Sequence, residues 1–256
     1  MVTCGMDIGS RTVKALLFDS ESDRIIGYRI DDAGVRPVQQ ANSLYRTLLR
    51  DTALKSKDVR RTVSTGYGRK AFHGAQKAVT EITCHARGTI FLFPRARFII
   101  DIGGQDSKAI ALDKKGHVQD FAMNDRCAAG TGRFLEMTAA ILKIPMDAMV
   151  RLALQAKKSA DINSMCAVFA ESEIVGLLSK GRTREEIVRG VMESLSKRVA
   201  AMAGRLGVNG QAVFSGGVAK NAAMVKLLER DLGTSLIVPE EPRITGALGA
   251  ALIAAG

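Results

Sequence analysis

The feature that most constrains the fold is an internal repeat. Residues 7–19, DIGSRTVKALLFD, align without a gap with residues 101–113, DIGGQDSKAIALD. Asp, Ile, Gly, Lys, Ala and the final Asp coincide, and each copy joins one apolar run to another. Repeated supersecondary units produce this kind of self-similarity. The pattern predicts two β-hairpins, each with Asp-x-Gly at its tip.

Such a tip is suited to a phosphate group. A glycine allows a tight turn and lets main-chain N–H groups approach an anion closely. The carboxylates of Asp7 and Asp101 would be stable beside that anion only with a cation between them, as in a Mg²⁺-nucleotide. We therefore predict that the two hairpins, one per domain, grip the phosphates from opposite sides. The chain has no Gly-Lys dipeptide, which excludes a P-loop, and no GxGxxG after a strand, which removes support for a Rossmann site.

The length of 256 residues favours two domains, and the start of the second repeat predicts domains at 1–95 and 96–256. The 46% hydrophobic and 25% charged residues are typical of a soluble globular protein. An early Asp7 argues against a signal peptide, and the apolar stretch 244–256 is too short to cross a bilayer. We expect a cytoplasmic protein without a membrane partner.

The net charge of +11 favours an acidic protein partner. Lys and Arg are scattered, no aromatic residues are interleaved with them, and Trp is absent. Single-strand platforms need such aromatic residues, so we expect no nucleic-acid partner.

Further elements follow from periodicity and turn residues. A strand at 212–214 leads into Ser215-Gly216-Gly217 and a helix that ends at Leu232, and bare glycine backbone there allows a flat ligand to lie against it. A strand at 59–64 leads into a glycine turn at 65–69, and a Gly/Ala helix closes the chain. Further helices are predicted at 40–53, 80–92, 127–141, 165–178 and 185–206.

Together, these hairpins and the late strand–Gly-Gly–helix resemble the phosphate-1, phosphate-2 and adenosine motifs of the actin/Hsp70/hexokinase superfamily. The resemblance implies an α/β, duplicated ribonuclease-H-like fold of two domains with ATP in the interdomain cleft.

A narrower resemblance rests on DIGGQD at 101–106, CAAGTGRFL at 127–135 and GGVAKN at 216–221. These segments look like the activator ATPases of 2-hydroxyacyl-CoA dehydratases, within the wider group that includes ATPase subunits of benzoyl-CoA reductase. The resemblance implies an oxygen-sensitive homodimer with one [4Fe–4S] cluster between its subunits. It also implies one-electron transfer from reduced ferredoxin or flavodoxin to the dehydratase, coupled to ATP hydrolysis.

The cysteines agree with this resemblance. A cubane cluster takes four thiolates, and Cys127 and Cys166 from each of two subunits would supply them. Both are predicted at helix starts, where the helix dipole favours a thiolate. Cys4 and Cys84 are expected to be small buried side chains.

Site roles then follow the motifs. Asp7 and Asp101 would position Mg²⁺ and its waters, and Gln105 would orient the attacking water. Lys14 and Lys108 could face either solvent or a phosphate. Glu171 and Glu173 could be solvated or ion-paired carboxylates, or they could contact the nucleotide and so link the ATP site to the cluster. The candidate ATP/ADP-binding residues are Gly9, Ser10, Arg11, Thr12, Gly103, Gly104, Gln105, Gly130, Gly132, Gly216, Gly217 and Asn221.

Two alternatives remain open at this point. The chain could be a benzoyl-CoA-reductase-type subunit, or a sugar or acyl kinase of the same fold without a cluster. A kinase needs a catalytic carboxylate near its acceptor hydroxyl, and none is identifiable in the sequence. A chaperone ATPase would need a peptide domain, for which this length leaves no room.

Overall fold

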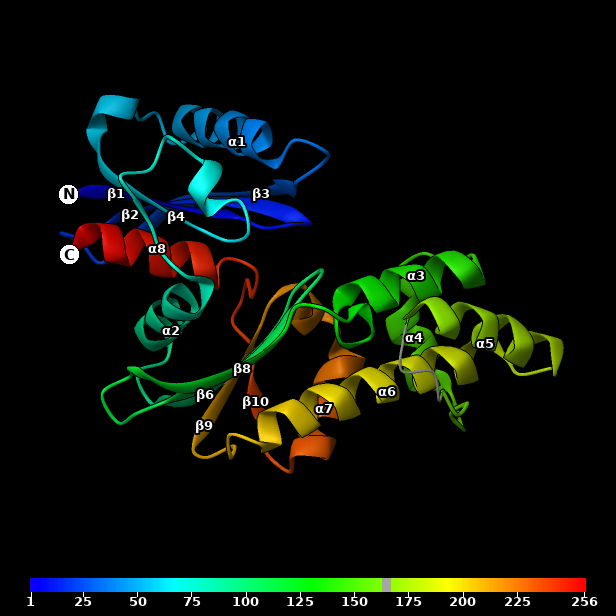
Figure 1. Cartoon of the computed structure of the whole chain (residues 1–256). Coiled ribbons are helices and arrows are strands. Elements are labelled where there is room, and N and C mark those ends of the chain that lie inside the picture. The colour runs from blue at the N-terminus through cyan, green and yellow to red at the C-terminus, as the bar shows by residue number, and fades with distance from the viewer. Residues whose placement is uncertain (163–166) are drawn as a thin grey trace. The chain divides into compact units, whose positions relative to one another are not determined.

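The computed structural model describes residues 1–162 and 167–256, which form two compact units (Figure 1). Unit 1 comprises Met1–Ile99, Leu112–Gln119 and Pro239–Gly256, and unit 2 comprises Ile100–Ala111 and Asp120–Val238. These units differ from a division at 95/96, because the C-terminal helix α8 packs on strand β1 and helix α2 of unit 1.

The first sheet has the strand order β3-β2-β1-β4-β5. Strand β1 pairs antiparallel with β2 and parallel with β4, so the first predicted hairpin is confirmed. Figure 1 shows helix α1 on one face of this sheet and α8 on the other. The elements are β1 (Val2–Ile8), β2 (Thr12–Asp19), β3 (Arg24–Asp32), α1 (Pro37–Asp51), η1 (Ser56–Asp58), β4 (Val59–Thr65), η2 (Arg69–Ala71), β5 (Lys77–Ala78), α2 (Glu81–Leu92) and α8 (Thr245–Ala255).

The central strands β1 and β2 of the first sheet are buried on both faces. Leu44 and Leu48 of α1 pack with Leu17 on one side, and Ala247 and Leu248 of α8 pack with strand residues on the other. Strand β2 therefore reads as an almost continuous apolar run rather than a clean alternation.

Helices α2 and α8 cross at glycines. A Cβ on Gly249 would lie 1.7 Å from the Cys84 carbonyl oxygen, and one on Gly88 would lie 2.1 Å from the Thr245 carbonyl oxygen. Only glycine allows this approach, which explains why the last helix is so rich in small residues.

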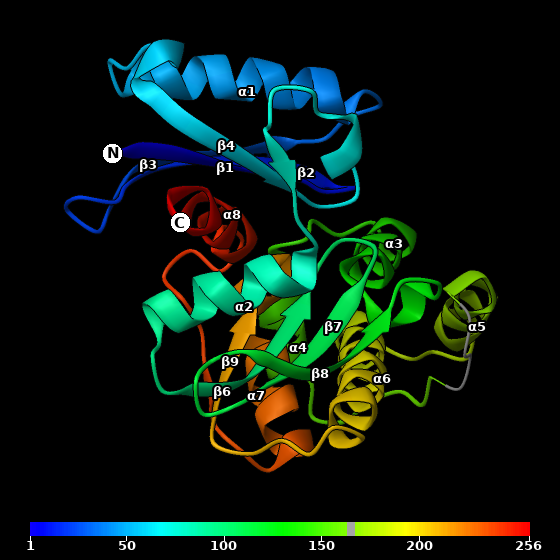
Figure 2. The ribbon, with the colours of Figure 1, turned by 60° about the vertical axis from the view of Figure 1, so that its left-hand side comes forward.

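The second sheet has the order β10-β9-β6-β7-β8, with the second predicted hairpin formed by β6 and β7. Figures 1 and 2 show helices α6 and α7 running side by side next to this sheet. The elements are β6 (Ala96–Ile102), β7 (Ser107–Leu112), β8 (Val118–Asn124), η3 (Ala128–Gly130), α3 (Gly132–Leu142), α4 (Ala148–Gln155), α5 (Ala167–Ser179), α6 (Arg184–Gly204), β9 (Gln211–Ser215), η4 (Gly217–Lys220), α7 (Ala222–Leu232) and β10 (Leu236–Ile237). No helix in the described part of the chain has both the length and the apolar character to span a bilayer.

Candidate functional site

The first hairpin places a carboxylate and an ammonium group together at its tip. Asp7, on β1, is 7% exposed and lies directly opposite Lys14 of β2. Lys14 Nζ is 2.9 Å from Asp7 Oδ2. The lysine therefore turns towards the aspartate and not towards solvent.

The second hairpin repeats this construction in a more buried setting. Lys108 is 2% exposed, and its Nζ lies 3.4 Å from Asp101 Oδ2 and 2.7 Å from Asp106 Oδ2. The other oxygen of Asp101 accepts a 2.8 Å hydrogen bond from the Ser215 hydroxyl. A buried carboxylate needs such partners, because an unpaired charge away from water is costly. Sequence periodicity left the direction of both lysines open, and the structure resolves it.

The turns determine which main-chain donors are available. Gly9 N–H donates to the Thr12 carbonyl (3.1 Å) and Gly103 N–H to the Asp106 carbonyl (2.9 Å), so these two predicted phosphate donors are already used within the turns. No protein acceptor in the described part of the chain takes the N–H of Ser10, Gly104 or Gln105. These three groups, all at the hairpin tips, are donors that an anion could use.

Gln105 has an exposed side chain whose amide makes no hydrogen bond within the described residues. If this amide capped the turn, it would hydrogen-bond to a main-chain group there. It has no such partner within the described residues, so it is available to a ligand or water.

The surroundings of Asp7 include residues to which sequence reasoning gave no site role. Gly66 has φ +88°, and a Cβ there would lie 2.6 Å from Asp7 Oδ1. A Cβ on Gly246 would lie 3.5 Å from Asp7 Oδ2 and 3.1 Å from Nε2 of the buried His85. The glycine turn at 65–69 and the start of α8 thus flank the carboxylate. The sequence signal that could have indicated this role is the predicted strand at 59–64 followed by the glycine turn at 65–69.

The segment after Cys127 is tied to the second hairpin. The N–H groups of Gly132 and Arg133 donate to the carbonyls of Gly103 and Gly104, both at 2.9 Å. A Cβ on Gly132 would lie 3.0 Å from the Gly103 carbonyl oxygen. Gly132 therefore lets the first turn of α3 rest on the hairpin tip.

The sequence predicted Cys127 at the start of an α-helix, and this prediction is wrong, because α3 begins only at Gly132. Cys127 precedes the one-turn η3, and the extended backbone at Thr131 (φ −138°, ψ 171°) separates η3 from α3. Cys127 is half-buried, its N–H donates to Asn124 Oδ1 (3.1 Å), and Asn124 Nδ2 donates to its carbonyl (2.8 Å). Asn124 thus fixes the main chain of Cys127 from both sides.

The other cysteines fall into two groups. Burial raises the pKa of the Cys4 thiol to about 12 and that of the Cys84 thiol to about 12, as expected for core residues. Cys166 lies outside the described residues. Within the described part, no three His, Cys, Asp or Glu side chains are grouped to hold a metal ion. The described residues of one chain therefore contain Cys127 as a candidate metal ligand but no complete set of ligands.

The candidate adenosine motif follows β9. Gly216 has φ +88°, and a Cβ there would lie 2.4 Å from the Ile102 carbonyl oxygen, so only glycine fits against the end of β6. Gly217 is exposed. Asn221 caps α7, because its Oδ1 accepts from the N–H groups of Ala223 and Met224 (3.0 and 3.1 Å). Its amide nitrogen is the part that remains for a ligand.

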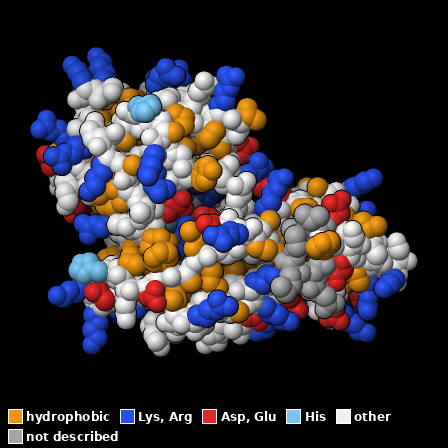
Figure 3. All heavy atoms as spheres, in the orientation of Figure 1, with side chains coloured by type: hydrophobic (Ala, Val, Ile, Leu, Met, Phe, Trp, Pro, Cys, Tyr) orange, Lys and Arg blue, Asp and Glu red, His pale blue; other side chains and the backbone are white. Residues whose placement is uncertain are grey.

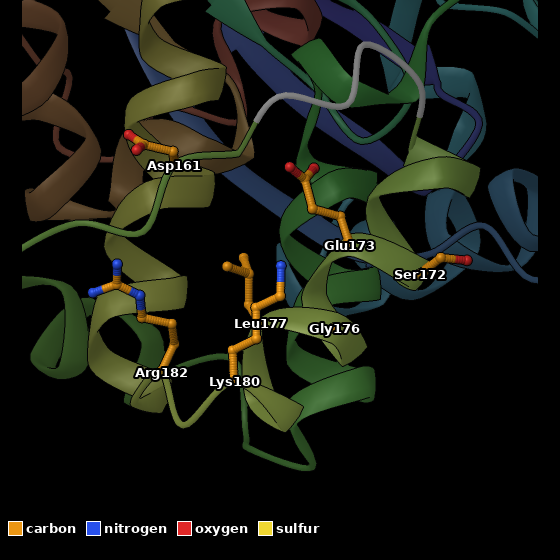
Figure 4. A pocket seen from close by; sticks show the side chains of 7 residues that line it. All are labelled: Asp161, Ser172, Glu173, Gly176, Leu177, Lys180 and Arg182. Atoms are coloured by element: carbon orange, nitrogen blue, oxygen red, sulfur yellow. The ribbon is translucent and has the colours of Figure 1, made fainter.

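A hollow of about 430 Å³ lies beside α5. Figure 4 shows Asp161 and Glu173 towards one end and Lys180 and Arg182 towards the other. Glu173 thus lines this hollow, whereas Glu171 is exposed.

Comparison with known proteins covers nearly the whole chain. Residues 4–254 match the BadF/BadG/BcrA/BcrD ATPase family. The activator of lactoyl-CoA dehydratase from Anaerotignum propionicum is 46% identical over 99% of this chain and 97% of its own. One of the subunits of benzoyl-CoA reductase from Thauera aromatica is 34% identical, covering 98% and 92%.

Among solved structures, the activator of the 2-hydroxyisocaproyl-CoA dehydratase from Clostridium difficile with bound ADPNP superimposes with a TM-score of 0.93. It is 40% identical, and the match covers 99% of this chain and 94% of that one. The likeness confirms the predicted duplicated two-domain fold of the actin/Hsp70/sugar-kinase type.

Proposed function

Because the chain belongs to the BadF/BadG/BcrA/BcrD ATPase family, we propose that it is an ATP-hydrolysing activator that transfers one low-potential electron to a 2-hydroxyacyl-CoA dehydratase. The observation that carries this proposal is the end-to-end similarity to the lactoyl-CoA dehydratase activator. The lower identity to the benzoyl-CoA reductase protein favours the dehydratase partner over a benzoyl-CoA-reductase-type complex.

ATP and ADP would bind with Mg²⁺ at the two hairpins. The N–H groups of Ser10, Gly104 and Gln105 are suited to phosphate oxygens, together with the neighbouring Arg11 and Thr12. Gly216, Gly217 and the amide nitrogen of Asn221 are suited to the adenosine. Gly132 would act by holding the start of α3 on the second hairpin, and Gly130 by leaving room for the Asn124 side chain, because a Cβ there would lie 2.7 Å from Asn124 Nδ2.

The residues present fit a Mg²⁺ ion. Asp7 and Asp101 are buried carboxylates, the ligand type that this hard cation prefers, either directly or through water. An ammonium already faces each of them, so both positions accept a cation. On nucleotide binding, Lys14 and Lys108 would turn to phosphate oxygens, which would leave Asp7 and Asp101 to hold Mg²⁺. Gln105 would orient the water that attacks the terminal phosphate.

The chain also fits half of a shared [4Fe–4S] site. Cys127 is half-buried and its main chain is fixed by Asn124, and Cys166 would supply the second thiolate from the same chain. The cluster would hold the one electron between its donor, a reduced ferredoxin or flavodoxin, and the dehydratase.

A homodimer would bring four cysteines together. Helix α5, which begins directly after Cys166, leaves Phe169 70% and Val175 50% exposed. Large apolar side chains that stay exposed on one helix support a protein interface there.

We propose that the activator works in the cytoplasm together with its redox partners.

The deciding experiment measures iron and acid-labile sulfide after anaerobic purification. We expect about four of each per dimer. Cys127→Ser and Cys166→Ser should each lose them, while Cys4→Ala, a buried position, should retain them. Iron-free protein that hydrolyses ATP and is indifferent to both serine variants would contradict the electron-transfer role and favour a kinase of the same fold.

A further inference from the structure

The positive charge of unit 1 is concentrated in one segment. Between positions 55 and 77 the sequence has seven Lys or Arg and a single acidic residue, Asp58. Asp58 uses a carboxylate oxygen to accept the N–H of Lys55 (2.7 Å), so it caps η1. Figure 3 shows many Lys and Arg side chains and few acidic ones on the visible part of this unit.

A local irregularity exposes two of these cations together. The pairing of β1 with β4 shifts register between Val2 and Thr3, so Val2 faces Val59 while Thr3 faces Arg61. Arg60 is the extra residue of this bulge, and both Arg60 and Arg61 are exposed. A regular strand would turn one of them to the opposite face.

Beside this segment, helix α1 carries a hollow of about 530 Å³, lined by Gln39, Asn42, Tyr45 and Arg46. Tyr45 packs against the core of the first sheet together with Leu54 and Val59. Leu54 directly precedes Lys55, and Val59 directly precedes Arg60 and Arg61. The hollow therefore lies next to the cationic segment.

We propose that this basic face binds an acidic surface of a partner protein. The basic face is defined as Arg46, Lys55, Lys57, Arg60 and Arg61.

Three observations support this partner class. No ion pair within the described residues involves any of the five cations, so their charge is not neutralised internally. Insertion into a lipid surface would require exposed large apolar side chains, and none lies between positions 46 and 62. Tyr45, the aromatic residue beside the face, is half-buried against the core, so bases find no fully exposed ring there on which to stack.

The amides of Gln39 and Asn42 beside Arg46 suit an Asp or Glu side chain that enters the hollow. A shallow charged face without apolar anchors fits a transient complex formed by electrostatic steering. The inference goes beyond the proposed function and does not depend on it, because its test involves no electron transfer.

The test compares two variants with the same net charge. One replaces Arg46, Lys57, Arg60 and Arg61 by Gln; the control replaces Lys114, Lys197, Arg205 and Lys226, which are exposed elsewhere, by Gln. Binding of poly-L-glutamate to the full-length protein is measured at low and physiological salt. We expect the face variant to bind about tenfold more weakly than wild type and the control less than about threefold.

Carbodiimide coupling then locates the contact, since activated glutamates should attach mainly to Lys55 and Lys57. Equal weakening in both variants, or cross-links spread evenly over exposed lysines, would overturn the proposal. Binding of an oligonucleotide or of phosphatidylglycerol vesicles that depends more strongly on the face than polyglutamate does would overturn the partner class.

Discussion

At the scale of single residues, the buried ammonium of Lys108 is the group on which the second hairpin depends most. It lies between Asp101 and Asp106, and its removal leaves buried carboxylate without its counter-charge. Lys108→Met should lower the free energy of unfolding by about 3 kcal/mol. Urea denaturation of the nucleotide-free protein measures this, with Lys115→Met, an exposed position, as a control within about 0.5 kcal/mol. Equal stability of the two variants would show that the ion pairs contribute little.

Gln105 has a different role, because its amide is exposed and engaged by nothing in the described structure. If it orients the attacking water, Gln105→Ala should lower the kcat of ATP hydrolysis about 100-fold and leave the nucleotide dissociation constant nearly unchanged. Gln119→Ala, also exposed, is the matched control. A kcat equal to that of the control would remove Gln105 from the mechanism.

The cysteines differ in reactivity for a physical reason. Burial raises the pKa values of Cys4 and Cys84 to about 12, so both remain protonated thiols at pH 8, and the thiolate is the reactive form. In cluster-free protein, iodoacetamide should label the half-buried Cys127 and spare Cys4 and Cys84 until urea is added. Peptide mass spectrometry reads out each site. Labelling of Cys84 in native protein would mean that helices α2 and α8 separate readily.

At the scale of elements, the crossing of α2 and α8 leaves no room for a side chain. Gly249→Ala would place a Cβ 1.7 Å from the Cys84 carbonyl oxygen, and the helices would have to move apart. We expect a loss of about 3 kcal/mol in the free energy of unfolding, measured by urea denaturation. Gly204→Ala in α6, where a Cβ meets nothing within 4 Å, should stay within about 1 kcal/mol. Similar effects of both changes would contradict the close crossing.

Elements with a strong pattern were predictable from the sequence, whereas the edge strands β3 and β8 were not. Both hairpins, α2, α6 and the final helix follow from repeats, periodicity and capping residues. Strands β3 and β8 were missed, because edge strands bury only part of one face and need no regular apolar alternation. The short α4 was missed as well.

The candidate site was predictable to a similar degree. The aspartates and glycines form a motif that the sequence shows directly. Strands buried on both faces have no apolar alternation to indicate which face a lysine takes, so the inward turn of Lys14 and Lys108 is seen only in the structure. The break between Cys127 and α3 also escaped prediction, since it depends on the hydrogen bonds of Gly132 and Arg133 to the second hairpin.

At the scale of the whole molecule, the proposed activity requires a dimer of two chains. A substitution on helix α5 can test whether the dimer interface lies there. Phe169 is 70% exposed on this helix, three residues after Cys166. Phe169→Asp would place a charge in an apolar interface, which is costly without a partner. We expect a monomer in sedimentation velocity that has lost its iron and sulfide but still binds ATP.

The matched control is Val35→Asp, a 97% exposed position in unit 1, which should remain an iron-containing dimer. Nucleotide binding by the Phe169 variant matters, because it separates loss of the dimer from loss of the fold. A Phe169→Asp protein that stays dimeric and retains its iron would move the interface away from α5. The four thiolates would then have to meet through another surface, and the exposure of Phe169 and Val175 would need a different partner.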